Sequence, residues 1–289
     1  MRRISVVLGG LFIAMSYVSS TTAEESKETL YSQINRAVIR LEHYELIKQE
    51  GSSKVITRNL PDGTGFFVTS TNQLFIVSAR HVVEQQYDLH ARVQTKHDKT
   101  GERKVFLLKF PRDKWIYHRN IGDAETSYVD VAVMRITRLK DWGIVHFMYA
   151  SMESADKEKN QLPTDDAEPP QSILVFGFPA GVGFELAEQH PIVRLGIISM
   201  KAGKKFIKLA DKKFVDERAC LIDARIFPGN SGSPVMNEIK FLDSKPRLLG
   251  LVIAANEALD YAIIEPTSRI KETIDQAIDS EPQDNWDDI

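Results

Sequence analysis

The chain has 289 residues, of which 43% are hydrophobic and 27% are charged, as is usual for a soluble globular protein with one large core or two smaller ones. Its 37 basic and 40 acidic residues give a formal net charge of -3, which excludes the strongly basic surface typical of nucleic-acid-binding proteins. We therefore expect no nucleic acid among its partners.

The N-terminal residues have the three parts of a secretory signal peptide. Arg2 and Arg3 precede an apolar run over residues 4–18, too short to span a membrane, and small residues follow up to Ala23. We expect cleavage after residue 23, a periplasmic or secreted location, and no membrane contact after cleavage. An uncleaved membrane anchor stays open as the alternative. The single cysteine, Cys220, allows no internal disulfide, so the exported protein must rely on its hydrophobic core.

The next part of the chain changes from a helical to a strand pattern. Apolar residues at helical spacing over residues 30–48 predict a helix inside an N-terminal helical segment, residues 24–55. Short runs of β-branched and aromatic residues then predict an N-terminal barrel over residues 56–153, with strands at 65–69, 74–77, 105–108 and 129–134. A polar, proline-containing stretch over residues 154–172 predicts a linker.

A second block of predicted strands covers residues 173–278, with strands at 173–176, 192–198, 206–209, 248–253 and 261–264. Pro266 precedes a last predicted helix over residues 267–278, and residues 279–289 form an acidic tail. Because long helices do not alternate with the strands, we predict an all-β fold. It consists of two antiparallel six-stranded β-barrels with an N-terminal and a C-terminal helix.

The stretch PGNSGSP at residues 228–234 places Ser231 between two glycines. Gly229 and Gly232 permit backbone angles that a Cβ would forbid, so the turn can aim the amides of Gly229 and Ser231 at the point that the serine hydroxyl faces. Acyl transfer needs a nucleophile beside such donors. Alone, the stretch is equally typical of a surface turn.

A serine hydroxyl also needs a base, and the base needs an acceptor that fixes its tautomer. His81 follows one predicted strand and Asp130 begins another, so the chain supplies histidine, aspartate and serine in that order. Each residue alone is a weak indication, because the chain has seven histidines and aspartate is common before strands. Together they indicate nucleophilic catalysis.

Several segments resemble the trypsin-like serine peptidases over residues 62–266, most closely the bacterial branch with the high-temperature-requirement periplasmic proteases and the glutamyl endopeptidases. These segments are TGFFV at 64–68, VSARHVV at 77–83, DVAV at 130–133, FGFP at 176–179, PGNSGSP at 228–234 and GLV at 250–252. The order of the three residues is also that of the chymotrypsin type, and not that of subtilisin or of α/β-hydrolases.

The resemblance implies a chymotrypsin-like fold and a role for each residue. His81 is then the general base, Asp130 the orienting acid and Ser231 the nucleophile, while the amides of Gly229 and Ser231 form the oxyanion hole. The segment Leu251, Val252, Ile253 and Ala254 is similar to the strand that pairs with the substrate backbone.

The chain departs from the family pattern at three places. Asn230 stands where many members have an aspartate that pairs with a newly cut N-terminus, so we expect no zymogen switch of that kind. Ser233 replaces a glycine, a small change. The last predicted helix ends at residue 278 of 289, so we expect no PDZ module.

The substrate preference has one candidate determinant. Arg225 has the spacing before Ser231 that often places a residue at the base of the primary pocket, where it would pair with an acidic substrate side chain. An arginine that points to solvent is the favoured alternative, because the strand alternation at this position is not known from the sequence. No His, Cys, Asp and Glu residues have the spacing of a catalytic metal site, so we expect no metal and no cofactor.

The predicted function is that of an exported serine endopeptidase acting on proteins or peptides through an acyl-enzyme. One alternative is a non-cleaving peptide- or protein-binding module on the same scaffold, which the complete triad disfavours. A second is an α/β-hydrolase esterase, disfavoured because Ser233 occupies the last glycine position of its motif and no histidine follows Ser231. The oligomeric state is not predicted.

Overall fold

A computed structural model describes residues 30–48, 55–71, 73–97, 99–119, 129–136, 142–144, 168–179, 190–201, 218–238, 247–256 and 260–280. The predicted signal peptide, most of the predicted linker, the predicted strand at 206–209 and the acidic tail from residue 281 lie outside these residues. Among the described residues, no helix is both long enough and apolar enough to cross a membrane.

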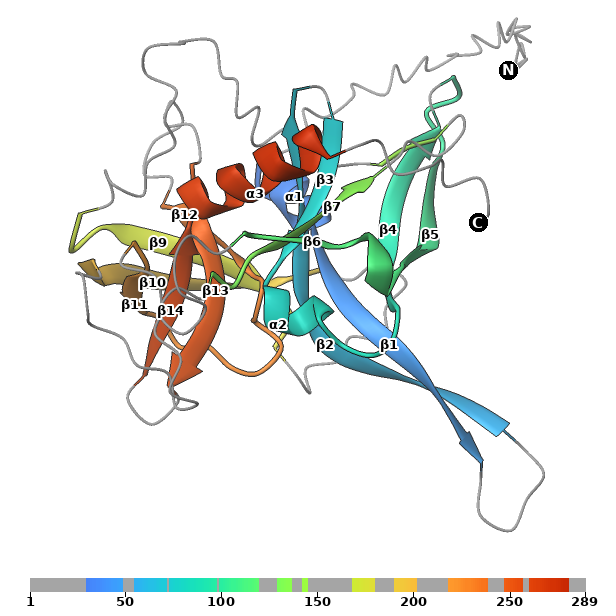
Figure 1. Ribbon diagram of the computed structural model, residues 1–289, viewed down its shortest axis with the longest axis horizontal. Coiled ribbons are helices and arrows are strands. Elements are labelled where there is room, and N and C mark those ends of the chain that lie inside the picture. Colours follow the sequence, from blue (N-terminus) through green and yellow to red (C-terminus); the bar gives the residue numbers. More distant parts are fainter. Residues whose placement is uncertain are drawn as a thin grey trace, which may run out of the picture.

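Strands dominate both halves of the molecule (Figure 1). The N-terminal half contains α1 (Leu30–Ala37), β1 (Val38–Lys48), β2 (Val55–Ser70), β3 (Gln73–Ser78), α2 (Arg80–Val83), β4 (Leu89–His97), β5 (Arg103–Phe110), the 3-10 helix Arg112–Lys114, β6 (Ile116–Tyr117), β7 (Ala132–Ile136) and β8 (Trp142–Ile144). The C-terminal half contains β9 (Ser172–Gly177), β10 (Ile192–Lys201), β11 (Cys220–Asp223), β12 (Pro234–Asn237), β13 (Leu248–Asn256), β14 (Tyr261–Pro266) and α3 (Thr267–Asp279).

The predicted N-terminal helix over residues 30–48 is correct only as far as Ala37. From Val38 the chain is strand β1, which pairs antiparallel with β2 from Val38 opposite Phe66 to Lys48 opposite Val55. The apolar spacing fits either structure, but β-branched residues such as Val38 and Ile39 favour strands, and β2 supplies backbone partners along the whole segment. The predicted helical segment 24–55 is therefore wrong over residues 38–48.

The N-terminal strands form one antiparallel sheet of eight strands in the order β5-β4-β1-β2-β3-β7-β6, with β8 paired to β4. The predicted six-stranded N-terminal barrel is therefore wrong in its strand count, because β1 and β8 both join the sheet. The predicted strand at 129–134 begins only at Ala132. This shift leaves Asp130 outside the strand, just before its first residue.

The C-terminal strands form a closed six-stranded barrel in the order β10-β11-β14-β13-β12-β9, which confirms the predicted barrel. The predicted last helix is confirmed as α3. This helix packs on β13 and β14 of the barrel and also on β6 and β7 of the N-terminal sheet. Figure 1 shows it running from the barrel across to the N-terminal sheet. It therefore links the two halves.

The hydrophobic core follows the same division. One cluster joins the N-terminal sheet to α3 and to part of the barrel, and it includes Phe67, Phe75, Phe110, Leu251 and Ile270. The other fills the barrel and includes Ile173, Ile198, Ile222, Leu249 and Ile264. Because the first cluster crosses from one half to the other, burial of apolar surface holds the halves together.

We predict that Leu249→Ala lowers the free energy of unfolding by about 2–5 kcal/mol, because it leaves a cavity inside the barrel where Leu249 is 1% exposed. Leu195→Ala on β10 is the matched control. Leu195 is 65% exposed, so the change should stay within about 0.5 kcal/mol. Urea unfolding followed by circular dichroism measures both, and equal losses in the two variants would contradict the barrel core.

Candidate active site

His81 and Asp130 lie in direct contact. Strand β3 leads into α2, which carries His81. Strand β3 also pairs with β7, with Ser78 opposite Ala132, so the start of β7 lies beside α2. The His81 Nδ1 atom is 2.5 Å from Asp130 Oδ2, and the His81 backbone N–H donates to Asp130 Oδ1 at 2.9 Å. Both oxygens of this carboxylate thus face residue 81.

The surroundings of the two side chains differ. The Asp130 side chain is 6% exposed, whereas the His81 side chain is 43% exposed. A carboxylate only accepts hydrogen bonds, so this contact favours the tautomer with the proton on Nδ1 and leaves Nε2 as a base. The geometry is that of a partly exposed imidazole oriented by a buried acid.

Ser231 lies in a tight turn between β11 and β12. The Asn230 N–H donates to the Phe227 carbonyl at 3.0 Å, and the Ser233 N–H donates to the Asn230 carbonyl at 2.9 Å. Gly229 and Gly232 have φ angles of 93° and 85°, which glycine adopts far more readily than other residues. The predicted need for glycine at both positions is therefore met by this backbone.

The turn is bound to the N-terminal sheet through Thr64 of β2. The Thr64 N–H donates to the Ser231 carbonyl at 2.8 Å, and the Thr64 hydroxyl donates to the Gly229 carbonyl at 2.8 Å. The same hydroxyl accepts the Phe178 N–H at 3.1 Å. These bonds place the serine turn against the strand that runs beside β3.

Gly232 brings the turn still closer to the residues that precede His81. A Cβ on Gly232 would lie 2.1 Å from the Thr64 carbonyl oxygen and 3.1 Å from the Ala79 nitrogen. Ala79 is two residues before His81. The serine turn thus lies close to the segment that leads into His81, at the junction between the two halves.

Two amides of the turn are available to a ligand. Among the described residues, neither the Gly229 N–H nor the Ser231 N–H donates a hydrogen bond. The neighbouring amide of Gly232, in contrast, donates to the Val252 carbonyl at 2.7 Å. The Gly229 and Ser231 amides remain the two donors that the sequence predicts for an oxyanion hole.

Asn230 is 1% exposed beneath this turn, next to Ser233. Gly177 at the end of β9 makes room for both, because a Cβ there would lie 2.1 Å from Ser233 Oγ and 2.3 Å from Asn230 Oδ1. The FGFP segment thus packs against the buried side chains of the turn. A neutral amide at this buried position needs no counter-charge.

The predicted substrate strand is only partly accessible. Leu251 pairs with Pro234 of β12, and the N–H and carbonyl of Val252 are bonded to the Ser233 carbonyl and the Gly232 N–H. Leu251 also pairs with Glu265 of β14 on the other side. Leu251 and Val252 are therefore unsuitable for pairing with a substrate backbone, which corrects the prediction. Ile253 and Ala254 lie beyond the turn on the same strand.

Arg225 is exposed, and its guanidinium lies 5.6 Å from the centroid of the Phe227 ring. The guanidinium of Arg194 on β10, which sequence reasoning missed, lies 4.8 Å from the same ring. Neither arginine forms an ion pair within the part of the chain that the structure describes. Two cationic groups therefore flank one aromatic ring, four residues before Ser231.

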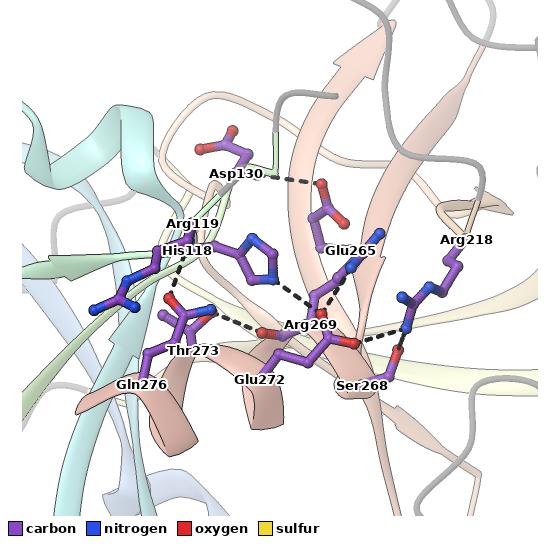
Figure 2. Close-up of polar contacts among 10 residues, drawn as sticks. All are labelled: His118, Arg119, Asp130, Arg218, Glu265, Ser268, Arg269, Glu272, Thr273 and Gln276. Atoms are coloured by element: carbon purple, nitrogen blue, oxygen red, sulfur yellow. Dashed lines mark hydrogen bonds and ion pairs between the residues drawn. The ribbon is translucent and has the colours of Figure 1, made fainter. Parts of the chain in front are cut away.

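A polar network lies behind Asp130, between α3 and the N-terminal sheet (Figure 2). Glu272 of α3 is bonded to His118 Nε2 at 2.9 Å, to Arg218 Nη1 at 2.8 Å and to Arg269 Nη1 at 2.7 Å. Gln276, one turn further, accepts the Arg119 N–H at 3.0 Å. Burial alone raises the pKa of Glu272, but the hydrogen bonds from Arg269, His118 and Arg218 outweigh it and lower the pKa to about 2.

The sequence gives little indication of these supporting residues. Thr64 lies at the start of the TGFFV segment, but the partners of its hydroxyl, Gly229 and Phe178, lie more than a hundred positions away. Glu265 precedes Pro266 in an apolar strand, where a glutamate is unusual, and that position was the only available hint.

The model of the family described as Trypsin-like peptidase domain matches residues 63–242. Among solved structures, the HtrA-type protease AlgW with a decapeptide is similar with a TM-score of 0.55 and 16% identity, over 86% of this chain and 66% of that one. A variant of AlgW with a decapeptide is similar with a TM-score of 0.52 and 15% identity, over 88% of this chain and 67% of that one. The chain thus spans about two thirds of their length.

The Rv3671c protease from M. tuberculosis in its active form gives a TM-score of 0.47 at 16% identity, over 88% of this chain and 86% of that one. No curated protein matches the sequence. The likeness to the AlgW structures supports the fold described above.

We predict that the contribution of Glu272 to stability depends on pH in the acid range. Because its pKa is about 2 in the folded protein and ordinarily 4.5, its stabilising effect is complete above 4.5 and is lost as the pH falls towards 2. The difference in unfolding free energy between the wild type and Glu272→Gln should therefore shrink over this range. Urea titrations at a series of pH values measure it. A difference that stays constant would contradict the ionic network.

Proposed function

Since the chain belongs to the trypsin-like peptidase family, we propose that it cleaves peptide bonds as a serine endopeptidase through a Ser231–His81–Asp130 triad and an acyl-enzyme intermediate. The motif resemblance is confirmed at the level of this family. The observation that carries the proposal is the bonded His81–Asp130 pair beside a serine turn whose main chain is held by Thr64.

The proposed mechanism assigns a step to each group. The Ser231 hydroxyl attacks the peptide carbonyl carbon while Nε2 of His81 takes its proton, and Asp130 stabilises the imidazolium. The amides of Gly229 and Ser231 donate to the oxygen that becomes negative. His81 then protonates the leaving amine, and a water molecule activated by the same imidazole hydrolyses the acyl-enzyme.

Peptide binding is proposed to use the backbone of β13 beyond the residues that pair with β12. Ile253 and Ala254 continue the strand beyond the serine turn, so an extended substrate can pair with the backbone there. The AlgW structures hold a decapeptide, which supports a peptide as the substrate.

Export is proposed on the sequence alone. The charged start, the short apolar run and the small residues up to Ala23 have the order of a signal peptide, which would place the enzyme in the periplasm or the medium. N-terminal sequencing of the exported protein tests this proposal.

We predict that Ser231→Ala lowers kcat by about 10⁴- to 10⁶-fold without a change in circular dichroism, because the nucleophile is lost while the turn is kept. A fluorophosphonate probe should label the wild type at Ser231 and leave the variant unlabelled. Turnover of a peptide substrate at the wild-type rate in Ser231→Ala would exclude the mechanism. A wild type that binds peptides without labelling would indicate a binding module.

We also propose that Arg225, together with Arg194, receives an acidic side chain of the substrate next to the scissile bond. A peptide library cleaved by the wild type should show enrichment of Asp or Glu near that bond. Arg225→Gln should reduce the enrichment by about tenfold, as expected for loss of one charge-assisted hydrogen bond, and leave cleavage of neutral peptides unchanged. A library without enrichment of Asp or Glu would contradict a role of Arg225 and Arg194 in substrate binding.

A further inference from the structure

Glu265 is a fully buried carboxylate for which the proposed mechanism has no use. It lies on β14 of the C-terminal barrel and is 0% exposed. Burying a carboxylate is costly unless it receives hydrogen bonds, so its position calls for a specific partner. One such partner is Asp130 of the proposed triad, whose backbone N–H donates to Glu265 Oε1 at 3.2 Å (Figure 2).

Asp130 depends on this bond because it precedes the regular strand. β7 begins at Ala132, and residue 130 has no ladder partner within the part of the chain that the structure describes. The Asp130 N–H is held by Glu265, and the Asp130 carbonyl accepts the Arg80 N–H at 3.3 Å. The main chain on both sides of the catalytic carboxylate is thus fixed by two residues, one from each half of the molecule.

The bond also connects the triad to the C-terminal helix. Arg269 of α3 is 7% exposed and donates to Glu272 at 2.7 Å, and in Figure 2 its side chain points towards both Glu265 and Glu272. Glu272 holds the His118 side chain, and the His118 N–H donates to the carbonyl of Val131, the residue after Asp130. The Asp130–Val131 segment is therefore held by β14 through Glu265 and by α3 through Glu272 and His118.

We propose that Glu265 is a positioning residue for the triad. Its carboxylate sets the main chain of Asp130, and through the two Asp130–His81 hydrogen bonds it sets the imidazole. The inference rests on the proposed roles of Asp130 and His81. It makes correct docking of the C-terminal barrel a condition for an aligned triad.

Three variants test the role of the acceptor atom. Glu265→Gln keeps an oxygen at the same place, Glu265→Leu removes it, and Glu265→Asp keeps the charge but moves the oxygen back by one methylene. We expect Glu265→Leu and Glu265→Asp to lower kcat for a peptide substrate by about 10- to 100-fold with little change in KM, since misplacing a catalytic group by about 1 Å has effects of this size. The kcat of Glu265→Gln should stay within about threefold of the wild-type value. Active-site titration normalises kcat to folded molecules.

The matched control is Thr267→Val at the junction of β14 and α3. It removes another buried hydrogen bond, from the Thr267 hydroxyl to the Leu248 carbonyl at 2.8 Å, without touching Asp130. We expect a lower Tm and an unchanged kcat. If Glu265 had only a structural role, Glu265→Leu and Glu265→Asp would likewise have lower stability and a wild-type kcat.

A second readout does not require turnover. The proton NMR resonance of His81 Nδ1–H, recorded in a Ser231→Ala background, reports on the bond to Asp130. It should shift or broaden in Glu265→Leu and Glu265→Asp and persist in Glu265→Gln and Thr267→Val. An unchanged resonance in the Leu and Asp variants would overturn the inference even if the wild type is an active peptidase. The expected shifts in a protein that cleaves nothing would support the positioning role and overturn the proposed function.

Discussion

The hydrogen bond from the Thr64 N–H to the Ser231 carbonyl joins the two halves of the molecule at the point where the proposed chemistry occurs. It is accompanied by the bond from the Thr64 hydroxyl to Gly229 and by the close approach of Gly232 to the Thr64 carbonyl. No alternative side chain at position 232 fits without displacing backbone. The serine turn therefore belongs structurally to both halves, although its residues come from the second.

The same dependence holds on the other side of the triad. His81 and Asp130 come from the N-terminal half, but the main chain of Asp130 is bonded to Glu265 of the barrel, and α3 holds His118 and Arg119. The core cluster that spans both halves supplies the non-directional attraction, and these polar contacts fix the register. The active geometry is thus a property of the interface rather than of either half.

Sequence reasoning reached the features that depend on neighbours in the chain. The glycines around Ser231, the His81 and Asp130 segments, the closed barrel and α3 all have local patterns, and the structure contains each of them. The helix over residues 38–48 was wrong because its apolar spacing fits a helix equally well, and only pairing with β2 decides for a strand. The pairing of β8 with β4 and the hydrogen bonds of the Val252 backbone were not predicted for the same reason, because both depend on residues far away in the sequence. Thr64 and Glu265 contact residues 165 and 135 positions away, which no local pattern encodes.

The most direct measurement is a crystal structure of the protein after reaction with a peptidyl phosphonate. The account predicts phosphorus bonded to Ser231 Oγ, its oxygen within hydrogen-bond distance of the Gly229 and Ser231 amides, and His81 Nε2 beside the leaving-group side while Nδ1 stays on Asp130. The peptide part should run along Ile253 and Ala254. An adduct on another residue, or a phosphonyl oxygen directed to solvent with His81 turned away from Ser231, would contradict the account.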